Sequence, residues 1–507
     1  MTKKIVIVGA GIGGIATASL LAKAGYEVHV YEKEPAAGGR AGKREIDGFT
    51  FDTGPSWYLM PDVFEHYYTL MGEDINKWLD LKKLTPAYKV FYEHHDPITV
   101  TGDIETDAAT FEMIEPGAGG ALRRYVEKSD DIYRLALDHF LYTNFESIRD
   151  LTAPAVLKKA GMLPSLLLRP IHSYVSSFVA DTRLRQILEY PMVFLGTSPF
   201  SAPAMYSLMS ALDFKEGVYY PQGGMYTIIE SMEKIAVSHG VTFHYGQSVE
   251  KIITRQRQAV GIRLADKTTI EADMVISNAD MHHTETQLLD QADQSYGESY
   301  WQSKEPGPSA LLMYLGVEGK VPEFEHHSLL FVDDWQKNFD AIYKDKSIPY
   351  PASIYVSKTS QTDPSVAPDD MENLFVLVPL PAGVDATPEE LTDLSNMYLS
   401  QIETMTGVTL QNRLKVKELF GPHDFRTKYY SWQSSMLGQS HLLRQSAFFR
   451  TPNVSKKVKG LYYVGGSTTP GIGLPMCLIG AELVYKRIVG DKRGGRVEQI
   501  DPVGGDA

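Results

Sequence analysis

Cysteine is almost absent from this sequence: among 507 residues, only Cys477 carries a thiol. A single cysteine cannot form an intrachain disulfide or hold a cysteine-based metal cluster. This usage is typical of a reducing compartment, so we expect a cytoplasmic protein. We predict no metal site.

Long apolar runs are missing as well. Nothing in the sequence reaches the roughly 18 uninterrupted apolar residues that indicate a membrane-spanning helix. The apolar run near the N-terminus is short and is explained by the first predicted strand, so we expect no secretory signal. Any contact with a membrane is therefore expected to be peripheral.

The sequence also lacks an excess of basic residues. It contains 49 Lys and Arg against 63 Asp and Glu, which gives a formal net charge of -14. Proteins that bind nucleic acid present a basic face to the phosphates, so we expect no nucleic-acid partner. The length exceeds that of one typical domain and predicts two.

A dinucleotide-binding pattern opens the chain. Residues 4–8 form an apolar run of strand length that leads directly into Gly9, Gly11 and Gly14 of a G-x-G-x-x-G turn. Glycine at these positions allows a tight turn, close approach of a pyrophosphate and packing of the next helix on the strand. That helix, predicted at 15–24, presents its N-terminal N–H groups to the phosphates.

An acidic residue follows at the expected distance. Residues 27–31 are predicted to form the second strand of a βαβ unit, and Glu32 stands where the ribose-binding acid belongs. An acid suits a free ribose 2′-hydroxyl and repels a 2′-phosphate. The motif therefore indicates FAD or NAD rather than NADP.

The residues after Glu32 favour FAD. Gly38, Gly39 and Arg40 form a pattern that resembles the flavoproteins with two dinucleotide-binding domains, whose arginine packs near the FAD pyrophosphate. Three further blocks, at 51–55, 220–225 and 466–476, look like the bacterial phytoene desaturases, which are FAD-dependent carotenoid desaturases. This resemblance covers essentially the whole chain.

The resemblance implies contacts with FAD from the N-terminal motif, from the turn that follows residue 51 and from the glycine-rich C-terminal block. The predicted cofactor-binding residues are Gly9, Gly11, Gly13, Gly14, Glu32, Lys33, Gly39, Arg40, Gly54, Pro55, Ser56, Val249, Gly465, Gly466, Gly473, Leu474, Pro475 and Met476.

The predicted fold class is α/β, with a Rossmann-like FAD-binding domain and a discontinuous mixed α+β substrate domain. The FAD-binding domain is assigned to 1–85, 215–290 and 455–492. The substrate and membrane-associated domain takes 86–214 and 291–454, and 493–507 is predicted to be a disordered tail.

The reaction implied by the resemblance removes two hydrogens from a saturated carbon pair, one as hydride to the flavin and one as a proton. Many family members carry histidine before the Pro-Gly of the C-terminal motif, whereas this chain has Thr469. No catalytic residue is assigned. The histidines that could act as the catalytic base are His172, His282, His283 and His441. Each is more simply explained as a structural or an exposed residue.

Several alternatives stay open. The substrate is expected to be a hydrophobic carotenoid such as phytoene, but a shorter diapo analogue or an already desaturated carotene fits equally. Other flavin enzymes remain, including a carotenoid isomerase or oxygenase and an amine oxidase, although Gly466 and Ser467 lack the acid of the amine oxidases. A non-enzymatic prenyl-lipid carrier resembling the Rab GDP-dissociation inhibitors shares the fold. Only one dinucleotide motif is evident, so oxygen or a quinone is the expected electron acceptor.

Two windows with few charges are notable. Residues 151–180 contain Lys158, Lys159 and Arg169 but no acid, and residues 166–168 are three leucines. This window is predicted either to pack in the core or to dock on an anionic membrane surface, with the three leucines entering the interface and the three bases meeting lipid phosphates. Residues 190–212 carry no charge, but their prolines and Gly196 forbid one continuous helix, so they are predicted to be buried, as plain core or as the wall of an apolar cavity.

Overall fold

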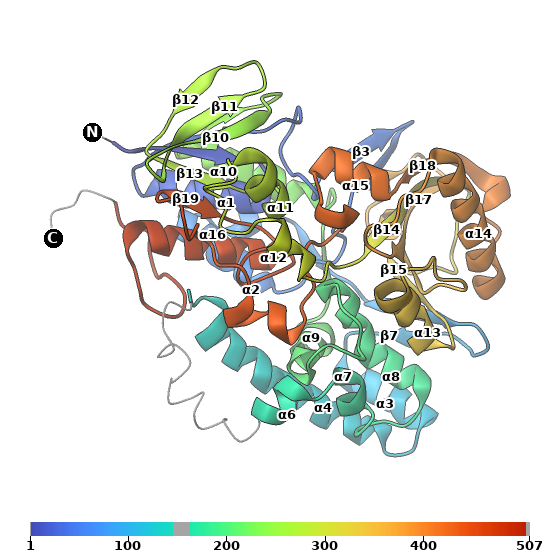
Figure 1. Cartoon of the computed structure of the whole chain (residues 1–507). Helices are drawn as coiled ribbons and strands as arrows, with labels where there is room; N and C mark the ends of the chain where they lie inside the picture. Colours follow the sequence, from blue (N-terminus) through green and yellow to red (C-terminus); the bar gives the residue numbers. More distant parts are fainter. Residues whose placement is uncertain (1, 145–162, 503–507) are drawn as a thin grey trace.

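The computed structural model describes residues 2–144 and 163–502. Its first sheet has five parallel strands (Figure 1). In spatial order these are β19 (Leu461–Tyr463), β13 (Met274–Ser277), β1 (Lys4–Val8), β2 (Glu27–Tyr31) and β9 (Thr242–His244). The apolar residues of β1 are buried because helices cover the sheet.

The helices that pack around this sheet come from distant parts of the chain. Helix α1 (Ile12–Lys23) contacts α10 (Tyr226–Ser238) and α16 (Leu474–Val489), while α2 (Pro61–Met71) contacts both α1 and α16. The predicted segments 1–85, 215–290 and 455–492 supply every strand of the sheet, and the domain boundaries themselves stay a prediction. The α/β fold class is confirmed.

Smaller sheets lie beside the first. Strands β10 (Val249–Arg255), β11 (Gln258–Leu264) and β12 (Thr269–Glu271) form an antiparallel sheet at the top of Figure 1. Two antiparallel pairs complete the set. The strands β3 (Lys43–Ile46) and β4 (Phe49–Asp52) form a hairpin, whereas β5 (Leu81–Lys83) and β8 (Tyr219–Pro221) come from distant parts of the chain.

A seven-stranded mixed sheet forms the second large unit. Its spatial order is β18 (Leu414–Phe420), β14 (Ser309–Glu318), β17 (Met371–Leu380), β16 (Ile354–Ser357), β15 (His327–Phe331), β6 (Tyr88–Tyr92) and β7 (Ile98–Val100). All pairs are antiparallel except β15 with β6. Helix α14 (Pro388–Thr406) packs against this sheet.

Helices fill the space between the two large sheets and below them in Figure 1. They are α3 (Ile104–Ile114), α4 (Ala118–Ala136), α6 (Leu163–Leu168), α7 (Ile171–Val175), α8 (Thr182–Glu189), α9 (Leu208–Ala211), α11 (Met281–His283), α12 (Glu298–Gln302), α13 (Trp335–Asp340) and α15 (Pro422–Tyr429).

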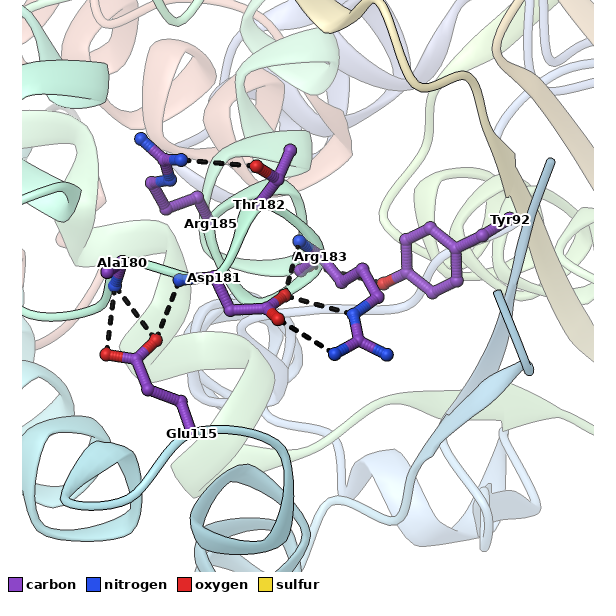
Figure 2. Close-up of polar contacts among 7 residues, drawn as sticks. All are labelled: Tyr92, Glu115, Ala180, Asp181, Thr182, Arg183 and Arg185. Atoms are coloured by element: carbon purple, nitrogen blue, oxygen red, sulfur yellow. Dashed lines mark hydrogen bonds and ion pairs between the residues drawn. The ribbon is translucent and has the colours of Figure 1, made fainter. Parts of the chain in front are cut away.

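Polar contacts at the start of α8 fasten this helical layer to the second sheet (Figure 2). The Glu115 carboxylate accepts hydrogen bonds from the backbone N–H groups of Ala180 and Asp181. Asp181 caps α8 by accepting from the N–H of Arg183, and the Tyr92 hydroxyl of β6 donates to the carbonyl of Arg183 at 3.2 Å. These contacts satisfy the N–H of Arg183 in the first turn of α8 and the two N–H groups that precede the helix.

Residues 190–212 are broken into short helices, as predicted from their prolines. Most of their side chains are buried. No helix among the described residues is long and apolar enough to cross a membrane.

The C-terminal segment differs from the predicted disordered tail. Val497 and Ile500 are buried, and the Val497 N–H donates to Glu482 of α16 at 2.6 Å. Arg496 forms an ion pair with Asp62 of α2. The chain stays packed through Ile500 because these two apolar side chains join the same hydrophobic core as α1 and α16. Residues 503–507 lie outside the described part.

Candidate functional site

Steric constraints explain the glycine turn between β1 and α1. A Cβ atom on Gly11 would lie 2.7 Å from the side-chain oxygen of Asn278, and one on Gly14 would lie 2.3 Å from the Gly9 carbonyl. Gly9 itself has φ of 96°, a conformation that L side chains rarely adopt. The turn is therefore a cradle that only glycine leaves open, as a bound pyrophosphate requires.

Glu32 lies at the end of β2 and faces the same turn. One carboxylate oxygen accepts from the N–H of Ala10 at 2.7 Å, and the other accepts from the N–H of Glu34 at 2.9 Å. Each oxygen retains further acceptor capacity for a ribose hydroxyl. Next to it, the Lys33 ammonium lies 4.1 Å from the centre of the Tyr430 ring.

Arg40 supplies positive charge beside the glycine turn. Its guanidinium donates to the Ser431 hydroxyl at 2.7 Å, while its buried Nε has no hydrogen-bond partner among the described residues. A buried unsatisfied donor is costly without a ligand. A Cβ on Gly54 would lie 2.7 Å from the Arg40 carbonyl, which explains why glycine stands there.

Arg450 organises the C-terminal glycine turn. This buried guanidinium donates to the backbone carbonyls of Gly466, Thr468, Gln439 and Gln445. Burial lowers the pKa of Arg450 to about 10, and no carboxylate pairs with it among the described residues. The charged Arg450 guanidinium thus contacts the backbone of the turn that leads into α16.

These elements meet around one cavity of ≈ 860 Å³. It is lined by all the predicted cofactor residues except Gly14, which packs against β1 instead. Those lining residues are Gly9, Gly11, Gly13, Glu32, Lys33, Gly39, Arg40, Gly54, Pro55, Ser56, Val249, Gly465, Gly466, Gly473, Leu474, Pro475 and Met476. Their roles as FAD contacts stay a proposal, but their chemistry fits the cofactor: a glycine cradle, an acid at the ribose position and an unsatisfied arginine donor.

Most of the remaining cavity wall is apolar. The charged residues among those that line it are Glu32, Lys33, Glu34, Arg40, Asp280 and Lys428. The two histidines on the wall, His283 and His441, have pKa values lowered by burial. Much of the rest is aromatic or aliphatic, and the polar exceptions include Asn338, Ser353, Thr468 and Thr469. The larger apolar lining residues include Trp57, Phe140, Leu166, Leu167, Tyr190, Phe194, Met205, Met209, Phe331, Trp335, Phe339, Tyr343, Tyr355, Phe448 and Phe449.

An aromatic cluster stands beside the predicted cofactor contacts and was not foreseen from the sequence. The His327 ring stacks on Trp57 with centroids 4.2 Å apart, and its Nδ1 lies 2.8 Å from the Tyr355 hydroxyl. Tyr355 in turn donates to the Ser56 hydroxyl at 2.7 Å. Burial holds the pKa of His327 well below its usual range, so this imidazole is neutral. The one feature of the sequence that could have indicated this cluster is the position of Trp57 directly after Ser56.

The four histidines considered from sequence occupy structural positions. His441 lines the cavity, but one ring nitrogen accepts from the N–H of Ile472 and the other bonds the Tyr206 hydroxyl at 3.0 Å. Burial lowers the pKa of His283 to about 4, and its ring stacks on Tyr430. The ring nitrogens of the other two lie within hydrogen-bond distance of carboxylates, His172 at 2.9 Å from Glu189 and His282 at 3.0 Å from Glu298.

The predicted membrane-docking leucines divide between two environments. Leu166 and Leu167 line the cavity, whereas Leu168 is 74% exposed. The prediction that all three enter a membrane is therefore wrong for Leu166, which is buried because α6 packs beside the helices of the cavity wall. Lys158 and Lys159 lie outside the described residues.

Fold and site together define a dinucleotide-dependent oxidoreductase with a deep apolar cavity. The chain belongs to the flavin containing amine oxidoreductase family, which matches residues 12–484. It is an FAD-dependent oxidoreductase.

Named relatives refine the comparison. The chain is 40% identical to a carotenoid 3,4-desaturase of Haloarcula japonica, with 96% of this chain and 98% of the relative covered. It is 33% identical to a zeta-carotene-forming phytoene desaturase of Myxococcus xanthus, with 96% and 94% covered. Among solved structures, a putrescine oxidase matches with a TM-score of 0.63 and 16% identity over 97% of this chain and 99% of that one, which shows the shared fold alone.

Proposed function

We propose that the protein is a carotenoid desaturase that removes two hydrogens at a time from a linear C40 carotenoid, such as phytoene. The observation that supports this most directly is the cavity wall. All six of its charged residues come from 32–40, Asp280 and Lys428, beside the predicted cofactor contacts. A long hydrocarbon is the substrate class that such a largely apolar wall accommodates.

Relatives support the same substrate class. The two desaturases named above act on carotenoids, and a 4,4'-diapolycopene oxygenase of Methylomonas is 31% identical over 96% of this chain. The C40 substrate is our specific proposal; a diapo substrate and an already desaturated carotene are outcomes that the experiment below separates.

An amine substrate fits this site poorly. An ammonium group taken from water needs an anion or several polar acceptors, and no carboxylate lines the apolar part of the cavity. A carrier without redox chemistry fits no better, because the family is one of flavin oxidoreductases and the glycine cradle with Glu32 is intact.

When bound, FAD supplies the acceptor for the hydride that leaves the substrate. The chain's own residues align a C–H bond, exclude water and stabilise the positive charge that develops on the polyene. Trp57, Tyr190 and Phe194 pack together on the wall, with centroid distances of 6.0 Å and 5.4 Å from Trp57 to the other two rings. Their faces suit a developing cation.

Peripheral membrane attachment is part of the proposal. A C40 hydrocarbon has almost no aqueous concentration, because each buried CH₂ is worth about 0.8 kcal/mol. Phe448 and Phe449 line the cavity and are also 48% and 61% exposed, which marks an opening, and Leu168 is exposed next to the cavity-lining Leu167. These three side chains are the proposed docking face. Oxygen or a quinone is the proposed final electron acceptor.

Expression of this chain in hosts that accumulate phytoene, diapophytoene or lycopene tests the substrate. Pigment analysis should show desaturated products in the phytoene host. Conversion in only the diapophytoene or the lycopene host would reassign the substrate, and no conversion in any host, with flavin bound, would contradict carotenoid desaturation.

A further inference from the structure

Asp213 is a buried carboxylate for which the proposed function so far has no use. It lies in the π-helix Leu212–Glu216, next to the cavity-lining Leu212, and is 3% exposed. One oxygen, Oδ2, accepts hydrogen bonds from the hydroxyls of Tyr88 at 2.8 Å and Tyr190 at 3.1 Å. The other oxygen, Oδ1, is buried without a hydrogen-bond partner among the described residues.

Burying this carboxylate without a counter-ion lowers the stability of the core. No cation forms an ion pair with Asp213 among the described residues, and a buried carboxylate with one unsatisfied oxygen costs several kcal/mol. Asparagine would accept the same two hydrogen bonds without a charge. A carboxylate that is kept buried, unpaired and half unsatisfied is suited to take up a proton.

Tyr190 connects this carboxylate to the cavity. Its ring lines the cavity wall, whereas Tyr88 and Asp213 do not. Tyr190 packs against Trp57, the residue after the predicted cofactor contact Ser56, with centroids 6.0 Å apart. The Tyr190 side chain therefore bridges the part of the cavity nearest the predicted flavin site and Asp213.

We propose that Asp213, acting through Tyr190, receives the proton that leaves the carotenoid in each desaturation. This inference rests on the proposed function and adds the missing proton acceptor to it. Tyr190 is the catalytic residue in this scheme because it contacts the substrate, and Asp213 is the positioning residue behind it.

Each desaturation breaks two C–H bonds and forms one C=C bond. One substrate C–H bond would break with its hydrogen leaving as hydride, and FAD, when bound, would be the acceptor of both electrons. The neighbouring C–H bond breaks, its electron pair forms the new C=C bond and its proton passes to the Tyr190 oxygen. Tyr190 releases its own proton to Oδ2 of Asp213. The proton and the hydride equivalent later leave together to the oxygen or quinone acceptor, which restores the carboxylate.

The local charges favour this cycle. Burial raises the pKa of Asp213 to about 7, the hydrogen bonds from Tyr88 and Tyr190 oppose that rise, and the carboxylate of Asp107 on α3 adds to it. The carboxyl group thus exchanges a proton near neutral pH, where a general base is most effective. Both tyrosines have their pKa raised far above the usual value by burial, so they relay a proton while remaining neutral overall.

Two tyrosine variants form a matched pair for the test. Tyr88→Phe and Tyr190→Phe each remove one hydrogen bond to the same oxygen, but only Tyr190 lines the cavity. With phytoene in liposomes, we expect Tyr190→Phe and Asp213→Asn to lower kcat about 100-fold with KM and bound flavin unchanged. Asp213→Glu should restore part of the rate, and Tyr88→Phe should lose less than tenfold. Equal losses in the two tyrosine variants would show a structural role and overturn the relay.

Two further measurements do not depend on the size of the rate change. The kcat of the wild type should rise through an apparent pKa near 7, and the Asp213→Asn variant should lack this step. Infrared difference spectra of an anaerobic single turnover should show the carbonyl band of a neutral buried carboxylic acid in the wild type and not in Asp213→Asn. A spectrum without that band in the wild type overturns the relay alone, whereas a wild type that desaturates no carotenoid overturns the proposed function.

Discussion

The carboxylate of Glu32 lies 2.7 Å from the backbone nitrogen of Ala10, so the acid at the end of β2 closes directly onto the glycine turn after β1. The predicted ribose acceptor and the predicted pyrophosphate cradle therefore lie together at the edge of the sheet where the parallel strands β1 and β2 end. The hydrogen bond therefore stabilises the position of Glu32 relative to the glycine turn in the protein without cofactor.

Replacing Glu32 should weaken flavin binding. In Glu32→Ala the ribose loses its charged acceptor, which should cost roughly 1.5 to 3 kcal/mol of FAD affinity. Fluorescence titration of the apoprotein with FAD measures the change. Glu27→Ala, on the exposed start of the same strand, is the control and should bind FAD like the wild type. Unchanged affinity in Glu32→Ala would contradict the assignment of this acid.

Arg450 should be needed for both stability and flavin retention. Arg450→Gln leaves several of the four carbonyls at the C-terminal turn without a donor, and each charged hydrogen bond is worth about 1.5 to 3 kcal/mol. We expect a loss of at least about 3 kcal/mol in the free energy of unfolding and a lower flavin content after purification. The control Arg444→Gln removes an exposed arginine paired with Glu305 and should change neither quantity. Equal effects in the two variants would show that the C-terminal turn does not depend on Arg450.

Glu32 and Arg450 show which site residues can be predicted from the sequence and which cannot. Glu32 was foreseen because the acid and the glycine turn stand at fixed spacings within one βαβ unit. Arg450 was not, because its four acceptors belong to loops on both sides of it and no motif marks them. Tyr88 and Tyr190 lie 125 and 23 positions from Asp213, so only the packing of β6 against the helices brings them together. Leu166 was misplaced for the same reason, since an apolar side chain can face a membrane or a cavity.

The stability of the protein should depend on Asp213 in a pH-dependent way. The pKa of this carboxyl group is about 7 in the folded protein and about 3.9 in an unfolded chain. Between these values the folded state holds a proton that the unfolded state lacks. As the pH falls from 7 toward 4, the wild type should therefore gain stability relative to Asp213→Asn, by up to about 1.4 kcal/mol per pH unit.

Urea unfolding of both proteins across this pH range measures the difference. Tyr88→Phe provides an internal check, because loss of a hydrogen bond that lowers the pKa of Asp213 should move the onset of the effect to higher pH. A difference between wild type and Asp213→Asn that is constant with pH would contradict the elevated pKa.

Liposome binding should depend on the exposed aromatic pair at the cavity opening. Phe448 and Phe449 line the cavity and are 48% and 61% exposed, and each would gain about 1.5 to 3 kcal/mol on burial in a bilayer interface. The double substitution of Phe448 and Phe449 by serine should lower co-sedimentation with phosphatidylglycerol liposomes at least tenfold while bound flavin is retained. Met113→Ser is the matched control, because Met113 is 81% exposed on α3 but does not line the cavity. If the double variant sediments like the wild type, or Met113→Ser loses binding to the same extent, the docking face lies elsewhere on the molecule.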